Sequence, residues 1–151
     1  MSGMAVETGL RVAAEARTWI GTPYCHGASL KGVGCDCLGL VRGVWRAVLG
    51  VEPEDPPPYS ADWAEASGDE RLLRAARRHL REIAPAEAGV GDLLLFRWRE
   101  GSPAKHLGIC SAPGRMIHAH DGAAVADVAF GIWRRRLAHA FRFPDIAPAR
   151  E

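Results

Sequence analysis

The chain has 151 residues, of which 48% are hydrophobic and 25% charged, proportions typical of a soluble globular protein with a sizeable core. This length fits one domain, so we expect a single domain over 1–151, with flexible ends at 1–5 and 145–151. Nineteen Lys and Arg residues nearly balance 18 Asp and Glu residues, and the net charge of +1 excludes a nucleic-acid binder that depends on bulk positive charge.

We do not expect the first ten residues, MSGMAVETGL, to form a targeting segment. Glu7 interrupts their apolar stretch, and no basic region precedes it. We therefore expect no secretory signal and synthesis in the cytoplasm, or export by a route without a cleaved leader. No apolar run approaches the roughly 18 residues that span a bilayer, so we also expect no membrane insertion.

Two helices are predicted in the first 50 residues. The first covers 6–19 and is followed by a glycine-rich stretch. Asp36 is a suitable N-cap for the second, whose wide apolar stripe ends before Gly50, so this helix should be central. The inward side chains would be Val6, Leu10, Ala13 and Ala14 in the first helix and Leu40, Val41, Val44, Trp45, Val48 and Leu49 in the second.

A stiff, proline-rich connector is predicted at 51–58, and Ser60 is a candidate cap for a short helical turn. An amphipathic helix is then predicted over 69–83, with Pro85 at its end. Its inward residues would be Leu72, Leu73, Ala76, Leu80 and Ile83, and its arginines would form a solvated outer face.

The second half of the chain has strand patterns separated by Gly, Pro and Asp turn residues. Helices followed by strands favour an α+β fold, with N-terminal helices packed on a C-terminal antiparallel sheet of about five strands. The predicted strands cover 92–98, 105–111, 115–120, 123–128 and 136–143.

Cys37 is a candidate nucleophile because it follows the cap Asp36 in the first turn of the central helix. Unpaired N–H groups and the positive end of the helix dipole stabilise a thiolate there. The charge of Asp36 opposes this effect unless its carboxylate is engaged elsewhere. The alternative interpretation is a small buried side chain in an apolar helix. Four cysteines in this length are too few for a disulfide scaffold, so free thiols are expected.

Three histidines fall on one face of a predicted hairpin. His106 lies on its first strand, and His118 and His120 lie on its second. One register places His106 opposite His118 and another places it opposite His120, close enough in either case for two imidazoles to hydrogen-bond. One histidine could then orient the other, as a third group orients the base in a catalytic triad.

A structural zinc site is a competing hypothesis, since Cys25, His26, Cys35 and Cys110 offer further soft ligands. The spacing of Cys35 and Cys37 argues against it, because a single residue separates them and no second close cysteine pair exists.

Five segments in order resemble the NlpC-type cell-wall peptidases, which are papain-like cysteine hydrolases. The segments are WIGTPY at 19–24, DCLGLV at 36–41, GDLLLF at 91–96, HLGI at 106–109 and IHA at 117–119, so the resemblance extends over nearly the whole chain. It implies a papain-like fold.

The resemblance also implies site residues. Cys37 would be the nucleophile, His106 the general base and His118 the residue that orients it, which favours the register with those two histidines opposite each other. Tyr24 would lie near the oxyanion site, and Asp36 would help to bind the peptide end of the substrate. Leu38 departs from the family pattern, which has a serine there.

The implied activity is hydrolysis of a peptidoglycan stem-peptide amide, namely the bond between γ-D-glutamate and a diamino acid, with no metal or cofactor. The stretch WRRRLAHAFRFP at 133–144 and the variant DCLG are similar to a subgroup found with phage tails and gene transfer agents. That similarity implies a place in a phage-tail-like particle, tail or baseplate proteins as partners, and action at the cell wall. The alternatives are a structural tail component with weak or no activity and a thioester-based acyltransferase.

Overall fold

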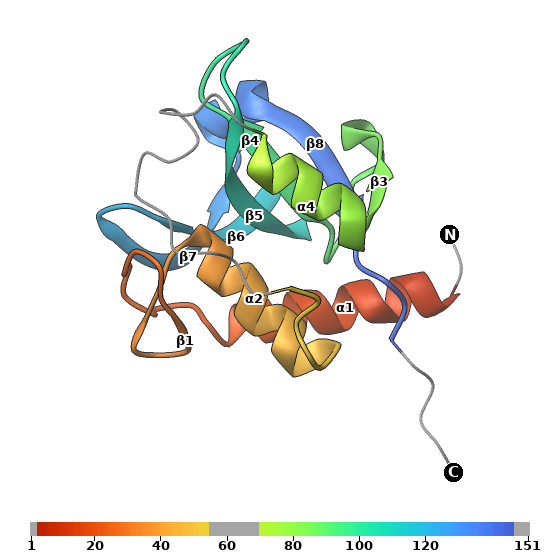
Figure 1. Cartoon of the computed structure of the whole chain (residues 1–151), viewed down its shortest axis with the longest axis vertical. Coiled ribbons are helices and arrows are strands. Elements are labelled where there is room, and N and C mark those ends of the chain that lie inside the picture. Colours follow the sequence, from red (N-terminus) through yellow and green to blue (C-terminus); the bar gives the residue numbers. More distant parts are fainter. Residues whose placement is uncertain (1–2, 55–69, 147–151) are drawn as a thin grey trace.

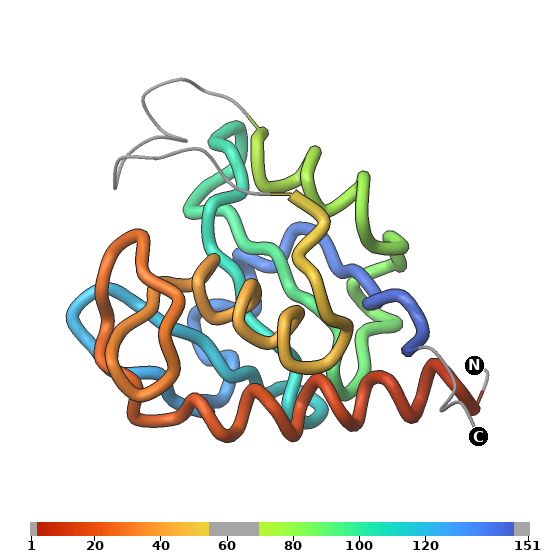
Figure 2. Tube along the Cα trace, turned by 60° about the horizontal axis from the view of Figure 1, so that its bottom comes forward, coloured from red at the N-terminus to blue at the C-terminus, as the bar shows by residue number. Residues whose placement is uncertain are grey.

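The protein is described from a computed structural model that covers residues 3–54 and 70–146. Three helices pack on one face of a six-stranded antiparallel sheet, which confirms the α+β class and the order of helices before strands (Figure 1). Figure 2 shows α1 (Gly3–Arg17) and α2 (Cys37–Val48) side by side. None of the helices in the described ranges is long and apolar enough to cross a membrane.

The main sheet has the strand order β3-β8-β4-β5-β6-β7, and all neighbours in it are antiparallel. Five of its strands confirm the predicted ones within a few residues. The strands are β3 (Arg81–Ile83), β4 (Leu93–Arg97), β5 (Ala104–Ala112), β6 (Arg115–His120), β7 (Ala123–Ala129) and β8 (Leu137–Arg142). Two short strands, β1 (Ser29–Leu30) and β2 (Gly34–Cys35), pair separately.

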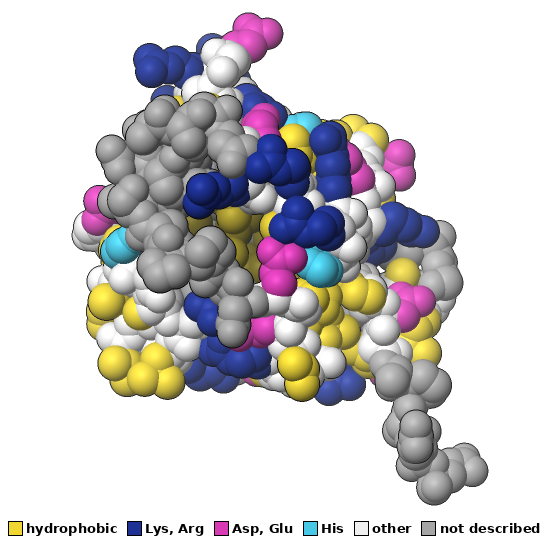
Figure 3. Space-filling view, in the orientation of Figure 1, with side chains coloured by type: hydrophobic (Ala, Val, Ile, Leu, Met, Phe, Trp, Pro, Cys, Tyr) yellow, Lys and Arg dark blue, Asp and Glu magenta, His cyan; other side chains and the backbone are white. Residues whose placement is uncertain are grey.

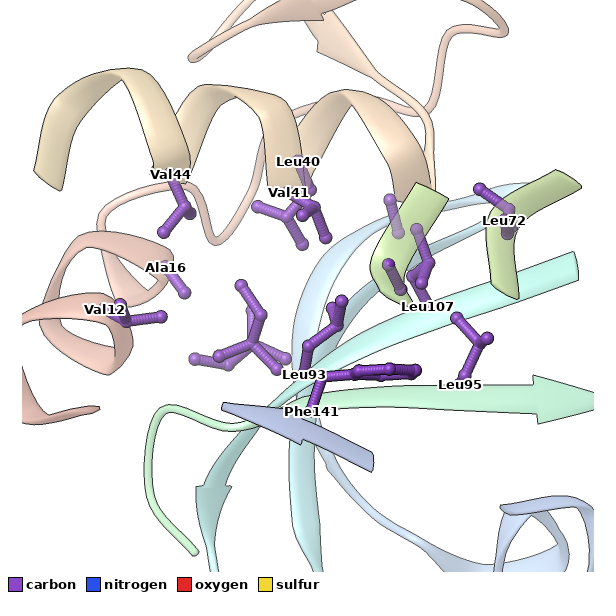
Figure 4. Close-up of a cluster of buried hydrophobic side chains, with 14 of the residues drawn as sticks. Val12, Ala16, Leu40, Val41, Val44, Leu72, Leu93, Leu95, Leu107 and Phe141 are labelled. Atoms are coloured by element: carbon purple, nitrogen blue, oxygen red, sulfur yellow. The ribbon is translucent and has the colours of Figure 1, made fainter. Parts of the chain in front are cut away.

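Helix α2 is central, as its apolar stripe predicts. Leu40 and Val44 are fully buried, against sheet residues that include Leu93 and Phe141 (Figure 4). Gly43 allows Trp19 to approach the helix closely, because a Cβ there would lie 2.0 Å from the indole ring. The structure thus accounts for a glycine in the middle of a buried helix.

The inward face predicted for the first helix is wrong at three of its four residues, since only Ala13 is buried. Val6 and Leu10 are about half exposed, at 47% and 56%, and Ala14 is exposed as well. Small residues determine the packing instead, because a Cβ on Gly9 would lie 2.4 Å from the Val90 carbonyl oxygen. The buried residues of α1 are Thr8, Gly9, Val12, Ala13 and Ala16.

The amphipathic helix predicted over 69–83 is shorter than expected. Helix α4 covers Arg71–His79, and Leu80 has an extended backbone. The following residues form β3, which pairs with β8, so hydrogen bonding at the sheet edge ends the helix before its apolar pattern does. Pro85 begins the 3-10 helix η1 (Pro85–Glu87). Residues 55–58 of the predicted connector and the turn at Ser60 lie outside the described residues.

Two hydrophobic clusters cover opposite faces of the sheet. The larger lies under the helices, and the smaller lies beneath the far face, where the 3-10 helix η2 (Gly131–Arg136) contributes Trp133. Near the other end of the chain, Ile146 is buried and its N–H donates to Thr8 Oγ1 at 3.1 Å. The smaller cluster contains Leu94, Phe96, Cys110, Met116, Phe130, Trp133 and Ala140.

Candidate active site

Asp36 joins the start of α2 to the preceding loop. One carboxylate oxygen accepts from the Gly39 N–H at 2.7 Å and the other from the Gly27 N–H at 2.7 Å. The residue is only 3% exposed, and His26 Nδ1 lies 3.8 Å from the carboxylate. The predicted N-cap is therefore confirmed, and its carboxylate also positions the loop that carries Tyr24.

We expect Asp36→Ala to lower the free energy of unfolding by about 2–4 kcal/mol, because it removes two hydrogen bonds to a buried carboxylate. Asp36→Asn should lose less, since its amide oxygen still caps Gly39. Urea unfolding measures both, with Glu7→Ala on the exposed face of α1 as the control. An Asp36→Ala protein as stable as the control would contradict this role of the carboxylate.

The Cys37 sulfur lies against β5 at the two residues that flank His106. Its thiol donates to the Lys105 carbonyl at 3.8 Å, and the backbone of Leu107 also hydrogen-bonds the sulfur. Cys37 is partly buried at the edge of the larger hydrophobic cluster. The fold therefore brings the start of α2 to the strand that carries His106, although 68 residues separate Cys37 from Lys105.

His106 and His118 form a buried hydrogen-bonded pair, with Nε2 of the first 2.8 Å from Nδ1 of the second. The register expected from the resemblance is nevertheless wrong. Ile109 pairs with Ile117, an alignment that continues towards His106 opposite His120. The His106–His118 bond is thus diagonal across the strands, a separation that long aromatic side chains can reach.

Burial keeps both histidines of this pair neutral. Burial first, then the charges of His118 and His120, lowers the pKa of His106 well below its usual value. Burial first, then the charge of His120, lowers the pKa of His118 to about 4. In the tautomer in which His106 Nε2 donates to His118, Nδ1 of His106 is unprotonated and can act as a base.

The thiol of Cys37 differs from the low-pKa thiolate that its position predicts. Burial first, and the Asp36 carboxylate second, raise the pKa of Cys37 to about 12. Backbone hydrogen bonds at the helix start act in the opposite direction but are weaker than burial. The resting site therefore holds a neutral thiol and a neutral imidazole, so proton transfer must accompany attack by the sulfur.

Tyr24 lies in the same region. It is partly buried, and its backbone forms a parallel β-bridge with Cys35, the residue before Asp36. Burial first, then the charge of Cys37, raises the pKa of Tyr24 to about 12. The phenol is therefore protonated near neutral pH and can donate a hydrogen bond.

A cavity of about 320 Å³ lies between α2 and α4. Its apolar wall includes Leu38 and Leu107, which directly follow Cys37 and His106 in the sequence. Leu38, which stands where the family pattern has a serine, therefore lines this cavity. Lys and Arg side chains surround hydrophobic atoms in this part of the surface (Figure 3). The basic residues along the cavity are Arg42, Arg71, Arg74, Arg78 and His79.

All four cysteines are free. Within residues 3–54 and 70–146, no group of three or more His, Cys, Asp or Glu side chains is arranged to hold a metal ion. The competing zinc hypothesis therefore has no ligand cluster in the described part of the chain.

The chain is similar to known proteins over most of its length. The model of the NlpC/P60 family matches residues 21–142. A gamma-DL-glutamyl hydrolase of Bacillus subtilis (strain 168) is 28% identical over 142 residues, which are 93% of this chain and 30% of that protein. The murein DD-endopeptidase MepS/murein LD-carboxypeptidase of Escherichia coli (strain K12) is 29% identical over 91% of this chain and 64% of that protein. The chain thus spans less than two thirds of either relative.

Two solved structures extend the similarity to the fold. The NlpC/p60 domain of the peptidoglycan hydrolase SagA is 26% identical, with a TM-score of 0.62, and 89% of this chain covers 98% of that one. The peptidoglycan hydrolase RipB of Mycobacterium tuberculosis is also 26% identical, with a TM-score of 0.58, and 95% of this chain covers 67% of it.

Proposed function

Because the chain belongs to the NlpC/P60 family, we propose that it is a cysteine peptidase that hydrolyses an amide bond in the stem peptide of peptidoglycan. One observation supports this most strongly. The Cys37 sulfur hydrogen-bonds the backbone of Lys105 and Leu107, the residues before and after His106. His106 is in turn hydrogen-bonded to His118. A nucleophile at the strand that carries a base, with a third group to orient that base, is the arrangement that acyl transfer requires.

We propose the bond between γ-D-glutamate and a diamino acid as the one cleaved. The segments that resemble the family support this assignment, and one relative is named a gamma-DL-glutamyl hydrolase. The murein endopeptidase among the relatives supports peptidoglycan as the polymer.

In the proposed reaction, the Cys37 sulfur attacks the amide carbonyl while His106 takes the thiol proton. The tetrahedral oxyanion accepts hydrogen bonds from the Cys37 backbone N–H and the Tyr24 hydroxyl. His106 then passes the proton to the departing amine as the C–N bond breaks and the thioester remains. His106 then takes a proton from water as the water oxygen attacks the thioester carbonyl. The C–S bond breaks, His106 returns the proton to the Cys37 sulfur, and the acid is released.

Digestion of purified peptidoglycan tests the proposal. We expect mass spectrometry to reveal a new amine on the diamino acid and a new carboxylate on D-glutamate. EDTA should leave the release unchanged, because the proposed reaction uses no metal ion. An unchanged fragment pattern after incubation with the folded protein would reject the assignment.

We also propose that a phage-tail-like particle carries the protein to the cell wall, in contact with tail or baseplate proteins. The similarity of 133–144 and of the DCLG variant to the tail-associated subgroup supports this proposal. Mass spectrometry of density-purified particles should detect the chain at a fixed ratio to the tail proteins. Its presence only in the particle-free fraction would contradict carriage.

A further inference from the structure

Trp133 lies directly against the candidate base. Its indole stacks on the His106 imidazole, with ring centroids 4.5 Å apart and an interplanar angle of 23°. The same indole meets His118 edge-on, at 5.7 Å and 83°. Trp133 therefore contacts both members of the hydrogen-bonded pair from the face of the sheet opposite α2.

The indole itself is held firmly. Trp133 is 8% exposed, and its backbone N–H donates to the Phe130 carbonyl at 2.8 Å. The Phe96 ring lies edge-on at 5.5 Å, and Trp98 lies 5.0 Å away on the outer side of the cluster. The Arg136 guanidinium covers Trp98 at 4.8 Å. The surface that supports His106 is thus a packed aromatic cluster rather than a mobile side chain.

We propose that Trp133 is a positioning residue that fixes the plane of the His106 ring. The outer torsion of a histidine side chain has broad energy wells, so strand geometry alone does not set the ring plane. The stacked indole restricts that torsion and keeps Nε2 directed at His118 Nδ1. It also excludes water from the imidazole pair, which strengthens their hydrogen bond. The consequence for catalysis rests on the proposed peptidase function, whereas the effect on the pair does not.

The test compares Trp133→Leu with Trp133→Phe. We expect Trp133→Leu to lower kcat by about 10- to 100-fold with KM changed less than about threefold, because a loosened base is misaligned during proton transfer. Trp133→Phe should recover most of kcat because it restores an aromatic face. Phe130→Leu is the matched control, since Phe130 is 7% exposed and packs edge-on against Phe96 in the same cluster.

Proton NMR provides a readout that needs no substrate. The N–H shared by His106 and His118 should give a downfield signal that persists in Trp133→Phe and Phe130→Leu and broadens by solvent exchange in Trp133→Leu. Equal kcat and an equally sharp signal in Trp133→Leu and Phe130→Leu would overturn the proposal. If Trp133→Leu does not fold, a folded Trp133→Phe protein that loses more than about tenfold in kcat and gives a broadened signal would do the same. A protein that cleaves no peptidoglycan but shows the expected NMR changes would refute the peptidase function and leave the positioning role supported.

Discussion

Cys37→Ala is expected to lower kcat for peptidoglycan cleavage by about 10³-fold or more, because it removes the sulfur on which the proposed thioester forms. The sulfur contacts the β5 backbone at Lys105 and Leu107, so alanine removes the nucleophile without leaving a buried charge. The melting temperature should therefore change little. Release of the new amine, measured by mass spectrometry of digests, gives the rate.

Cys25→Ala is the matched control for this prediction. Cys25 is an exposed free thiol on the loop beside Asp36, and its replacement tests whether any nearby thiol supports the reaction. We expect Cys25→Ala to retain wild-type kcat. Cleavage that survives in Cys37→Ala but disappears in Cys25→Ala would transfer the nucleophile to the loop.

Local sequence signals predicted the parts of the site that local chemistry determines. Asp36 has a short acceptor side chain ahead of an apolar stripe, and the structure shows it as the N-cap of α2. Gly50 has a positive φ of 100° just beyond that helix, as expected of a glycine that ends one. Such signals depend on a few adjacent residues, so tertiary contacts did not alter them.

The errors arose where distant contacts decide the outcome. The inward face of α1 depends on the close approach of Gly9 to Val90, which the spacing of apolar residues does not encode. Strand β3 exists because β8 supplies its hydrogen bonds across about 60 residues of chain. The hairpin register also differs from the expected one, because the side-chain hydrogen bond between His106 and His118 forms on the diagonal.

The two chemical groups of the candidate site are supported by different hydrophobic clusters. Cys37 packs at the edge of the larger cluster under the helices. His106 is held from the other face, by Trp133 of the smaller cluster. The cluster that packs around the nucleophile and the cluster that packs around the base therefore lie on opposite faces of the sheet. The two groups meet at β5, which carries His106 and contacts the Cys37 sulfur. The sequence carries no signal for the role of Trp133, because an aromatic residue in a 3-10 helix has no characteristic spacing.

His106→Ala is expected to lower kcat by about 10³-fold or more, because the neutral thiol of Cys37 then has no base to take its proton. His118→Ala should cost less, about 10- to 100-fold, since it removes only the group that orients the base. The rates at which the two folded variants cleave peptidoglycan show which substitution lowers kcat more. A larger loss in His118→Ala would mean that the roles of the two histidines are reversed.

The wild-type pH profile tests the same base independently. Neutral imidazole is the competent form, and burial holds the pKa of His106 well below its usual value. As the pH falls, His106 therefore stays unprotonated through the range in which an exposed histidine takes up a proton, near pH 6.5. We expect kcat/KM to stay level down through about pH 6.5 and to decline only in more acidic solution, as His106 becomes protonated. A midpoint at or above the usual histidine value would mean that the working base is solvated, which the buried His106–His118 pair does not allow.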